Sequence, residues 1–114
     1  MINPELLCNQ HLLGEHSEIH KHRHNFVKKH KISGRIFPIV QIEPLSMQSR
    51  HDELHKEMER RFKKTYDSPY QQPDLNHLPI NEKNARVDIA LSLQDLSCRC
   101  EKCREKIQQI VFSD

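Results

Sequence analysis

The residues from Gln10 to His24 read QHLLGEHSEIHKHRH and place two glutamates and five of the chain's nine histidines on fifteen consecutive positions. Histidine has only a middling helix propensity, and ionisable side chains are rarely buried for packing alone, so stability does not explain this composition. At about 100° per residue, Leu12, Ile19 and Phe26 recur every seven positions and form one apolar seam. The stretch therefore predicts a helix that packs on a core and carries titratable side chains beside it.

Two polar strips follow this seam on the helical wheel, the first beside the seam and the second on the far side of the first. The first combines imidazoles and carboxylates: His11, Glu15, Glu18 and His22. The second is neutral or cationic: Gln10, Lys21 and Lys28. Three interpretations of the first strip are open. It can be a solvated face with weak ion pairs, a metal site if several ligands converge, or the place of one carboxylate that works as a general acid/base.

The composition favours a small all-α single domain. The 114 residues suit one domain with a modest core, since 35% are hydrophobic, 30% are charged and only two are glycine. We expect three main helices, over residues 9–31, 46–64 and 84–112, with long irregular connectors between them. The apolar faces predicted for the second and third helices comprise Leu54, Met58, Phe62, Ile89, Leu93 and Leu96.

Cations gather where acids are absent. No Asp or Glu occurs between Glu18 and Glu43, and the cations of that span are Lys21, Arg23, Lys28, Lys29, Lys31 and Arg35. A second group closes the second predicted helix: Arg60, Arg61, Lys63 and Lys64. The pattern favours contacts with nucleic-acid phosphates, although the net charge is only +2 and a solvated helix face has the same signature. Phe37, Tyr66 and Tyr70 in the connectors can stack on bases or cover edges of the core.

No apolar run approaches the roughly 20 residues of a membrane span, and the first residues lack signal-peptide features. We therefore expect an intracellular protein without a membrane partner.

Three of the four cysteines lie close together near the C-terminus. In a reducing compartment Cys98, Cys100 and Cys103, spaced as C-x-C-x2-C, predict a structural zinc knuckle at residues 98–103. Cys8 or His77 would supply a fourth ligand. The alternative is a set of reduced thiols at a helix end.

The segment from Gln10 to Glu18, QHLLGEHSE, resembles the signature of the pyrimidine-dimer DNA glycosylases of the phage endonuclease V type. In that family a segment containing Ile-Asn precedes a helix that reads Gln-His-Leu-x-x-Glu-x-x-Glu. A second block, Arg50 to Glu57 with Arg61 beyond it, resembles the family's Arg-x-x-Glu-Leu-x-x-Glu segment. The two blocks occur in the family's order, at the N-terminus and in the second predicted helix.

The resemblance implies an enzyme that excises a damaged or modified base from duplex DNA and then cuts the strand, with no cofactor for catalysis. The free α-amino group attacks C1′ and forms a Schiff base, and a glutamate on the first helix assists this step and the later β-elimination. The matching catalytic residues are Met1 and Glu18. Matching positions and the cationic strip together give the predicted DNA-binding residues: Gln10, His11, Lys21 and Lys28.

The chain departs from the family pattern at three places. The bulky Ile2 would keep the initiator in place, so the amine would be that of Met1. The family's C-terminal aromatic cluster is missing, so specificity for pyrimidine dimers does not follow from the resemblance. Ser17 stands where the family has an arginine. We therefore predict a monomeric DNA glycosylase with abasic-site lyase activity and a structural zinc. The alternatives are a non-catalytic, zinc-stapled helical protein that binds nucleic acids and, third, a metal-dependent nuclease.

Overall fold

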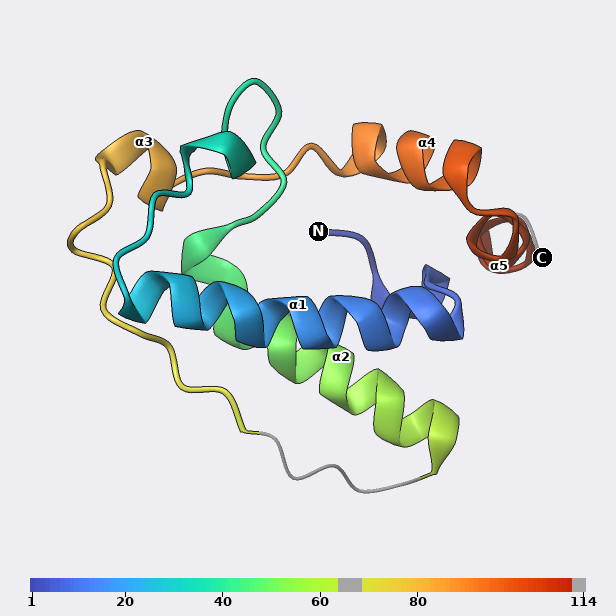
Figure 1. Ribbon diagram of the computed structural model, residues 1–114. Helices are drawn as coiled ribbons and strands as arrows, with labels where there is room; N and C mark the ends of the chain where they lie inside the picture. The colour runs from blue at the N-terminus through green and yellow to red at the C-terminus, as the bar shows by residue number, and fades with distance from the viewer. Residues whose placement is uncertain (64–68, 112–114) are drawn as a thin grey trace.

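All regular elements in the described residues, 1–63 and 69–111 of this computed structural model, are helical (Figure 1). The α-helices are α1 (Asn9–Val27), α2 (Met47–Phe62), α3 (Ile80–Lys83), α4 (Ile89–Arg99) and α5 (Glu101–Val111). Three short 3-10 helices supplement them: η1 (Pro4–Leu6), η2 (Ser33–Arg35) and η3 (Pro44–Ser46). The predicted all-α class is confirmed, with four main helices in place of three.

Helices α1 and α2 pack against each other at the centre of the molecule (Figure 1). The predicted seam of α1 is confirmed, since Leu12, Ile19 and Phe26 are each no more than 2% exposed. From α2, Leu54 and Met58 enter the same core, as their spacing predicts. No helix among the described residues combines the length and apolar character that crossing a membrane requires.

Both central helices end earlier than their sequence pattern predicts. Helix α1 stops at Val27, short of residue 31, because Lys29 adopts a left-handed backbone with φ of 58°. Helix α2 stops at Phe62, short of residue 64, because Lys63 does the same with φ of 53°. A left-handed residue is a common helix terminator, but it is usually glycine or asparagine. Lysine at these two positions therefore gave no stop signal in the sequence.

The third predicted helix, 84–112, begins later than expected and is divided in two. Asp88 caps α4 by accepting a hydrogen bond of 3.1 Å from the Leu91 N–H, so the helix starts at residue 89. The backbone is extended at Cys100, which separates α4 from α5. Leu96 is buried as predicted, but the prediction for Ile89 was wrong, because its side chain is 47% exposed.

The C-terminal helix returns to the start of the chain. Helix α5 packs on η1, next to the first turn of α1 (Figure 1). Cys103 and Ile107 of α5 are buried in one core with Leu6 and Leu7, which lie in and directly after η1. This arrangement brings the C-terminal cysteines to the beginning of the helix that carries most of the predicted site.

Candidate active site and thiol cluster

The first residues of the chain are tied to both central helices by Arg50 of α2. This guanidinium is 3% exposed and makes two hydrogen bonds to the carboxylate of Glu15 on α1, at 2.5 and 2.9 Å. It also donates to the backbone carbonyl of Ile2. A bidentate arginine–carboxylate pair has a fixed geometry, so this bridge determines where the segment before η1 lies.

The α-amino group of Met1 lies 3.8 Å from the carboxylate of Glu43, which sequence reasoning had not singled out. Glu43 is buried and accepts hydrogen bonds from Ser46 Oγ, the Val87 N–H and Arg86 Nη1, at 3.0, 2.9 and 3.1 Å. Burial alone would raise the pKa of Glu43. The hydrogen bonds from Val87, Ser46 and Arg86, together with the positive amine, outweigh burial and hold this pKa below its usual value. Glu43 is therefore an anionic anchor for the amine.

The imidazole–carboxylate strip of α1 is divided between two sites. Glu15 pairs with Arg50, whereas the His11 ring lies at the N-terminal end of the helix beside cysteine thiols. Glu18 is exposed, one turn after Glu15. Burial and Arg35 lower the pKa of His22, while the negative charges of Glu18 and Glu15 oppose that shift. The four side chains of the strip thus do not form one metal site.

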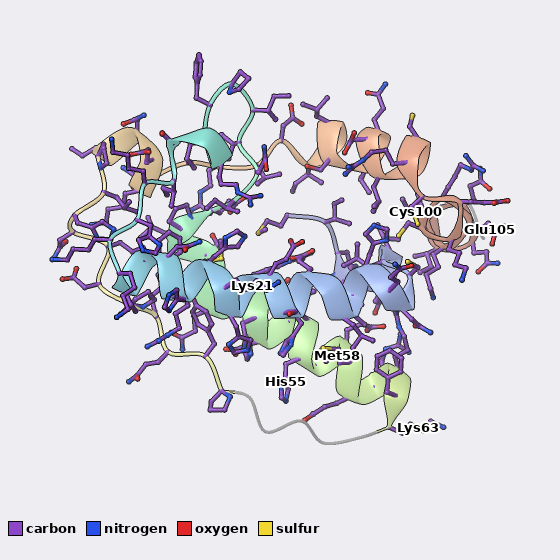
Figure 2. The ribbon with its side chains drawn as sticks, viewed as in Figure 1. Lys21, His55, Met58, Lys63, Cys100 and Glu105 are labelled. Atoms are coloured by element: carbon purple, nitrogen blue, oxygen red, sulfur yellow. The ribbon has the colours of Figure 1, made fainter. Side chains whose placement is uncertain are left out.

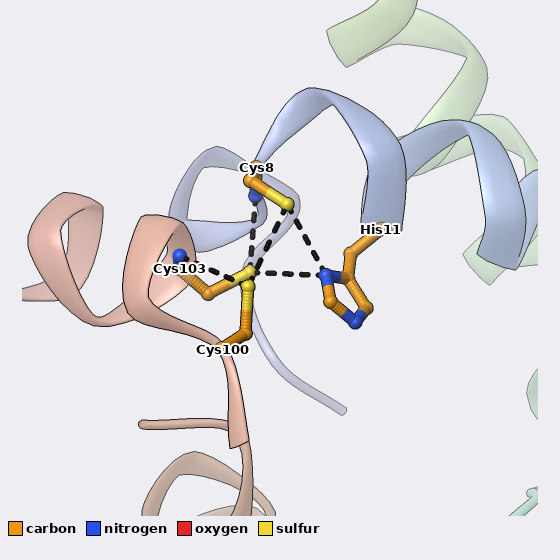
Figure 3. A group of neighbouring side chains, drawn as sticks. All are labelled: Cys8, His11, Cys100 and Cys103. Carbon is orange, nitrogen blue, oxygen red and sulfur yellow. Dashed lines mark hydrogen bonds between the residues drawn. The ribbon is translucent and has the colours of Figure 1, made fainter. Parts of the chain in front are cut away.

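Four side chains converge where the C-terminal helices meet the start of α1 (Figure 3). Cys8 is the N-cap residue of α1, His11 lies in its first turn, Cys100 lies between α4 and α5 (Figure 2), and Cys103 belongs to α5. The ligand atoms all lie within 4.8 Å of one another. This group is called the thiol cluster below.

The distances within the thiol cluster suit one tetrahedral metal ion. Cys8 Sγ lies 3.9 Å from Cys100 Sγ and 3.1 Å from His11 Nδ1, and Cys103 Sγ lies 3.5 Å from the same nitrogen. A zinc–sulfur bond of about 2.3 Å gives sulfur–sulfur edges of about 3.8 Å in a tetrahedron. The N–H groups of Cys8 and Cys103 donate to sulfurs of the cluster, as outer-shell donors do in metal sites. The cluster can therefore hold a structural metal such as zinc.

The composition of the thiol cluster differs from the predicted ligand set in one member. Three predicted ligands, Cys8, Cys100 and Cys103, come together. Cys98 is exposed and lies outside the cluster, because it is in the last turn of α4 before the chain turns at Cys100. His11 takes the fourth place, although sequence reasoning assigned it to DNA. The C-x2-C spacing of Cys100 and Cys103 and the C-x2-H spacing of Cys8 and His11 are the signals that could have found this set.

The predicted DNA-binding residues other than His11 are solvent-facing. Gln10, Lys21 and Lys28 are exposed on α1, and Figure 2 shows Lys21 at the middle of that helix. Gln10 borders an open hollow whose lining includes the cations Arg61, Lys102 and Lys106. This hollow lies directly beside the thiol cluster, because Cys8 also lines it.

Two members of the second predicted cationic group, Arg60 and Arg61, pair with Glu57 of α2, while Lys63 is exposed. Arg61 is 11% exposed and donates to the carbonyls of Leu7 and Pro4 and to the Glu57 carboxylate. Arg60 is paired with Glu57 at 2.5 Å. The Arg61 guanidinium therefore fastens η1 to α2, and its role as a phosphate contact stays a prediction. Lys64 lies outside the described residues.

The three aromatic side chains of the predicted connectors have different positions. Phe37 is 79% exposed on the loop after η2. Tyr70 is buried and its ring stacks on His51, with centroids 5.5 Å apart, so it covers the core. Tyr66 lies outside the described residues. Of the two that the structure describes, Phe37 is the side chain that is accessible to a base.

Comparisons with known proteins assign the family. A model of the pyrimidine dimer DNA glycosylase family matches residues 1–69, which span η1, α1 and α2 with the anchored amine. No curated protein and no solved structure matches the chain. The family match covers more than half of the sequence and both blocks on which the resemblance rested. The chain therefore belongs to the pyrimidine dimer DNA glycosylases, a family of DNA glycosylase/abasic-site lyases.

Proposed function

We propose that this enzyme removes a damaged or modified base from duplex DNA and cuts the strand through a Schiff base on the α-amino group of Met1. The observation that carries the proposal is the Arg50 bridge. It joins Glu15 of α1 to the Ile2 carbonyl, one residue from the amine, and Glu43 binds the amine itself. A nucleophile held in one place avoids the loss of freedom that a mobile chain end would undergo in the transition state.

The proposed chemistry needs the amine and one carboxylate. The amine lone pair forms a bond to C1′ while the bond from C1′ to the base breaks, and the base leaves with that electron pair and takes up a proton. The nitrogen lone pair then forms the C=N bond while the C1′–O4′ bond breaks, and O4′ keeps that electron pair and takes up a proton from water, which gives the protonated imine. Glu18 removes a proton from C2′, and the 3′ phosphate leaves with the electrons of its C–O bond. Glu15 is committed to Arg50, so Glu18 is the carboxylate of this strip that can accept the proton.

Glu43 has a different role in this proposal. Its pKa is held below the usual value, so it is a weak proton acceptor. Its carboxylate faces the amine and is fixed by three other donors, which suits a residue that positions the nucleophile. Glu43 is therefore a positioning residue, and Glu18 is the general acid/base.

Cleavage of DNA that contains an abasic site, measured in excess EDTA, tests the amine. Cleavage should continue in EDTA and should be lost after acetylation or extension of the N-terminus, because an amide nitrogen cannot form an imine. Cleavage that needs Mg²⁺ and survives N-terminal extension would support the metal-dependent nuclease instead. Binding of DNA without cleavage under any of these conditions would support the non-catalytic alternative.

Exchange of a single carboxylate tests the general acid/base. Glu18→Gln keeps the shape of the side chain but removes the proton acceptor, so turnover should fall by about 10²-fold or more while affinity for DNA is kept. Glu101→Gln, at an exposed position of α5, is the matched control and should leave turnover unchanged. Equal turnover of the Glu18→Gln variant and the wild type would remove Glu18 from the mechanism.

We also propose that the thiol cluster holds one structural Zn²⁺. The ion would fasten the junction of α4 and α5 to the start of α1 and would compensate for a small core. Cys100→Ser should lower the zinc content and the melting temperature, whereas Cys98→Ser, outside the cluster, should change neither. Equal zinc loss in the two variants, or a metal-free wild type with unchanged stability after chelation, would contradict this assignment.

A further inference from the structure

A second group of possible ligands lies between the two central helices. His16 and His20 are one turn apart on α1, and His51 belongs to α2. Their ring centroids are separated by 4.9 to 5.1 Å, and one ligand atom from each lies within 4.8 Å of the others. Imidazoles four residues apart on one helix, completed by a third from a neighbouring helix, form a common type of divalent-metal site.

The orientation of His51 prepares one nitrogen for a ligand. His51 is 2% exposed, and its Nδ1 lies 3.1 Å from the Asp52 carboxylate. The carboxylate accepts a hydrogen bond, so Nδ1 carries the proton and Nε2 presents a lone pair. A carboxylate that fixes the tautomer of a histidine in this way is typical of metal-ligating histidines.

Two imidazole nitrogens in this group lack hydrogen-bond partners among the described residues. They are the buried Nε2 atoms of His51 and His20. A buried acceptor without a donor typically costs about 1–3 kcal/mol, so such atoms are rare in folded proteins. A cation between the rings would satisfy both nitrogens when the proton of His20 is on Nδ1. The ring of Tyr70 covers His51 from one side and limits access of water.

The protonation state of the group suits metal binding. Burial, followed by the neighbouring rings of His51, His20 and His55, lowers the pKa of His16 to about 4. Burial likewise lowers the pKa of His20. Neutral imidazole is the form that binds metals, so these side chains need little deprotonation at neutral pH.

We propose that His16, His20 and His51 bind a second divalent cation of the kind that imidazole prefers, with Zn²⁺ as the representative, and that this ion fastens α1 to α2. Three protein ligands leave the fourth position to water or another donor. On the helical wheel His16 and His20 lie about 160° from Glu18, so the ion is placed away from the proposed catalytic face. The site does not depend on the proposed amine chemistry or on the thiol cluster.

Binding of Co²⁺, used as a spectroscopic probe for Zn²⁺, tests this site in the full chain. The wild type should retain about two equivalents after desalting, and only the ion in the thiol cluster should show thiolate-to-cobalt charge transfer. His20→Gln should lose about one equivalent and keep the charge-transfer band. Cys100→Ser should do the opposite, losing or weakening the band and keeping the other equivalent. His24→Gln, at an exposed position of the same helix, is the control and should retain two.

A melting curve adds a second readout. Zn²⁺ should raise the melting temperature of metal-free Cys100→Ser protein, and the rise should disappear when His20→Gln is added to that variant. Retention of the same amount of metal by the wild type and His20→Gln would overturn the proposal. So would a Cys100→Ser protein that binds no Co²⁺ and gains no stability from Zn²⁺. The partly buried His20 position is used because replacing the buried His51 risks loss of the fold.

Discussion

Replacement of Arg50 by methionine removes the link between the chain start and the two central helices. Methionine keeps the length of the apolar stem, so the change isolates the guanidinium. The variant loses two charged hydrogen bonds to Glu15 and one to the Ile2 carbonyl. Such bonds contribute about 1.5–3 kcal/mol each to stability, and removing one partner of a buried ion pair costs about 3–5 kcal/mol.

The expected loss is below the sum of these values because Glu15 is not fully buried. Its side chain is 25% exposed, so water can solvate part of the carboxylate that remains. We expect Arg50→Met to lower the free energy of unfolding by about 2–4 kcal/mol. An unfolding entropy of about 2.1 cal/mol/K per residue, over 114 residues, makes this a fall in melting temperature of about 8–17 °C.

Thermal unfolding followed by circular dichroism measures this effect, and Arg99→Met is the matched control. Arg99 pairs with Asp95 at 2.8 Å, but both side chains are more than half exposed, so its loss should change stability by no more than about 0.5 kcal/mol. Arg50→Lys should fall between wild type and Arg50→Met, because it keeps the charge and loses the bidentate geometry. Equal stability of Arg50→Met and Arg99→Met would refute the structural role assigned to Arg50.

Two further predictions concern DNA affinity and acid stability. Lys21→Ala and Lys28→Ala should each weaken binding to all DNA sequences, because each removes a contact to a phosphate. Each should also reduce the slope of log affinity against log salt concentration by about one. An unchanged slope in a salt titration would exclude these lysines as phosphate contacts. A hydrogen bond from Arg60 lowers the pKa of Glu57, burial opposes this effect, and a hydrogen bond from Arg61 adds to it. The pKa of Glu57 is therefore held below its usual 4.5. The stabilisation by ionised Glu57 should therefore be complete above about pH 4.5 and should vanish as pH falls through the lowered pKa. The gap in melting temperature between wild type and Glu57→Gln should then narrow on acidification, and a constant gap would contradict this.

Periodicity made the centre of the fold predictable. Leu12, Ile19 and Phe26 form a strict seven-residue pattern, and a buried helix face leaves that pattern in any sequence. The ends of the helices were less predictable because lysines at 29 and 63 occupy a backbone conformation for which glycine is the usual signal. The exposure of Ile89 depends on how the first turn of α4 lies relative to the rest of the fold, and the local sequence does not encode that placement.

The site was most predictable where its members share one helix, although the sequence also predicted three members of the thiol cluster, Cys8, Cys100 and Cys103. Glu15 and Glu18 were found because spacing fixes their common face, but the commitment of Glu15 to Arg50 depends on how α1 meets α2. Glu43 lies just before η3 with no regular pattern around it, and only the path of the chain brings it to the amine. The place of His11 in the thiol cluster was missed because its partner Cys103 is 92 residues away along the chain, and only the fold brings the two together.

Location of the covalent adduct on the protein tests the central claim most directly. Borohydride reduces an imine to a stable amine, so reaction with abasic-site DNA in EDTA should give a trapped protein–DNA complex. After proteolysis and nuclease digestion, mass spectrometry should place the sugar remnant on the α-amino group of the N-terminal peptide that begins with Met1. An adduct on a lysine side chain, or cleavage of the DNA with no trapped complex, would contradict the account.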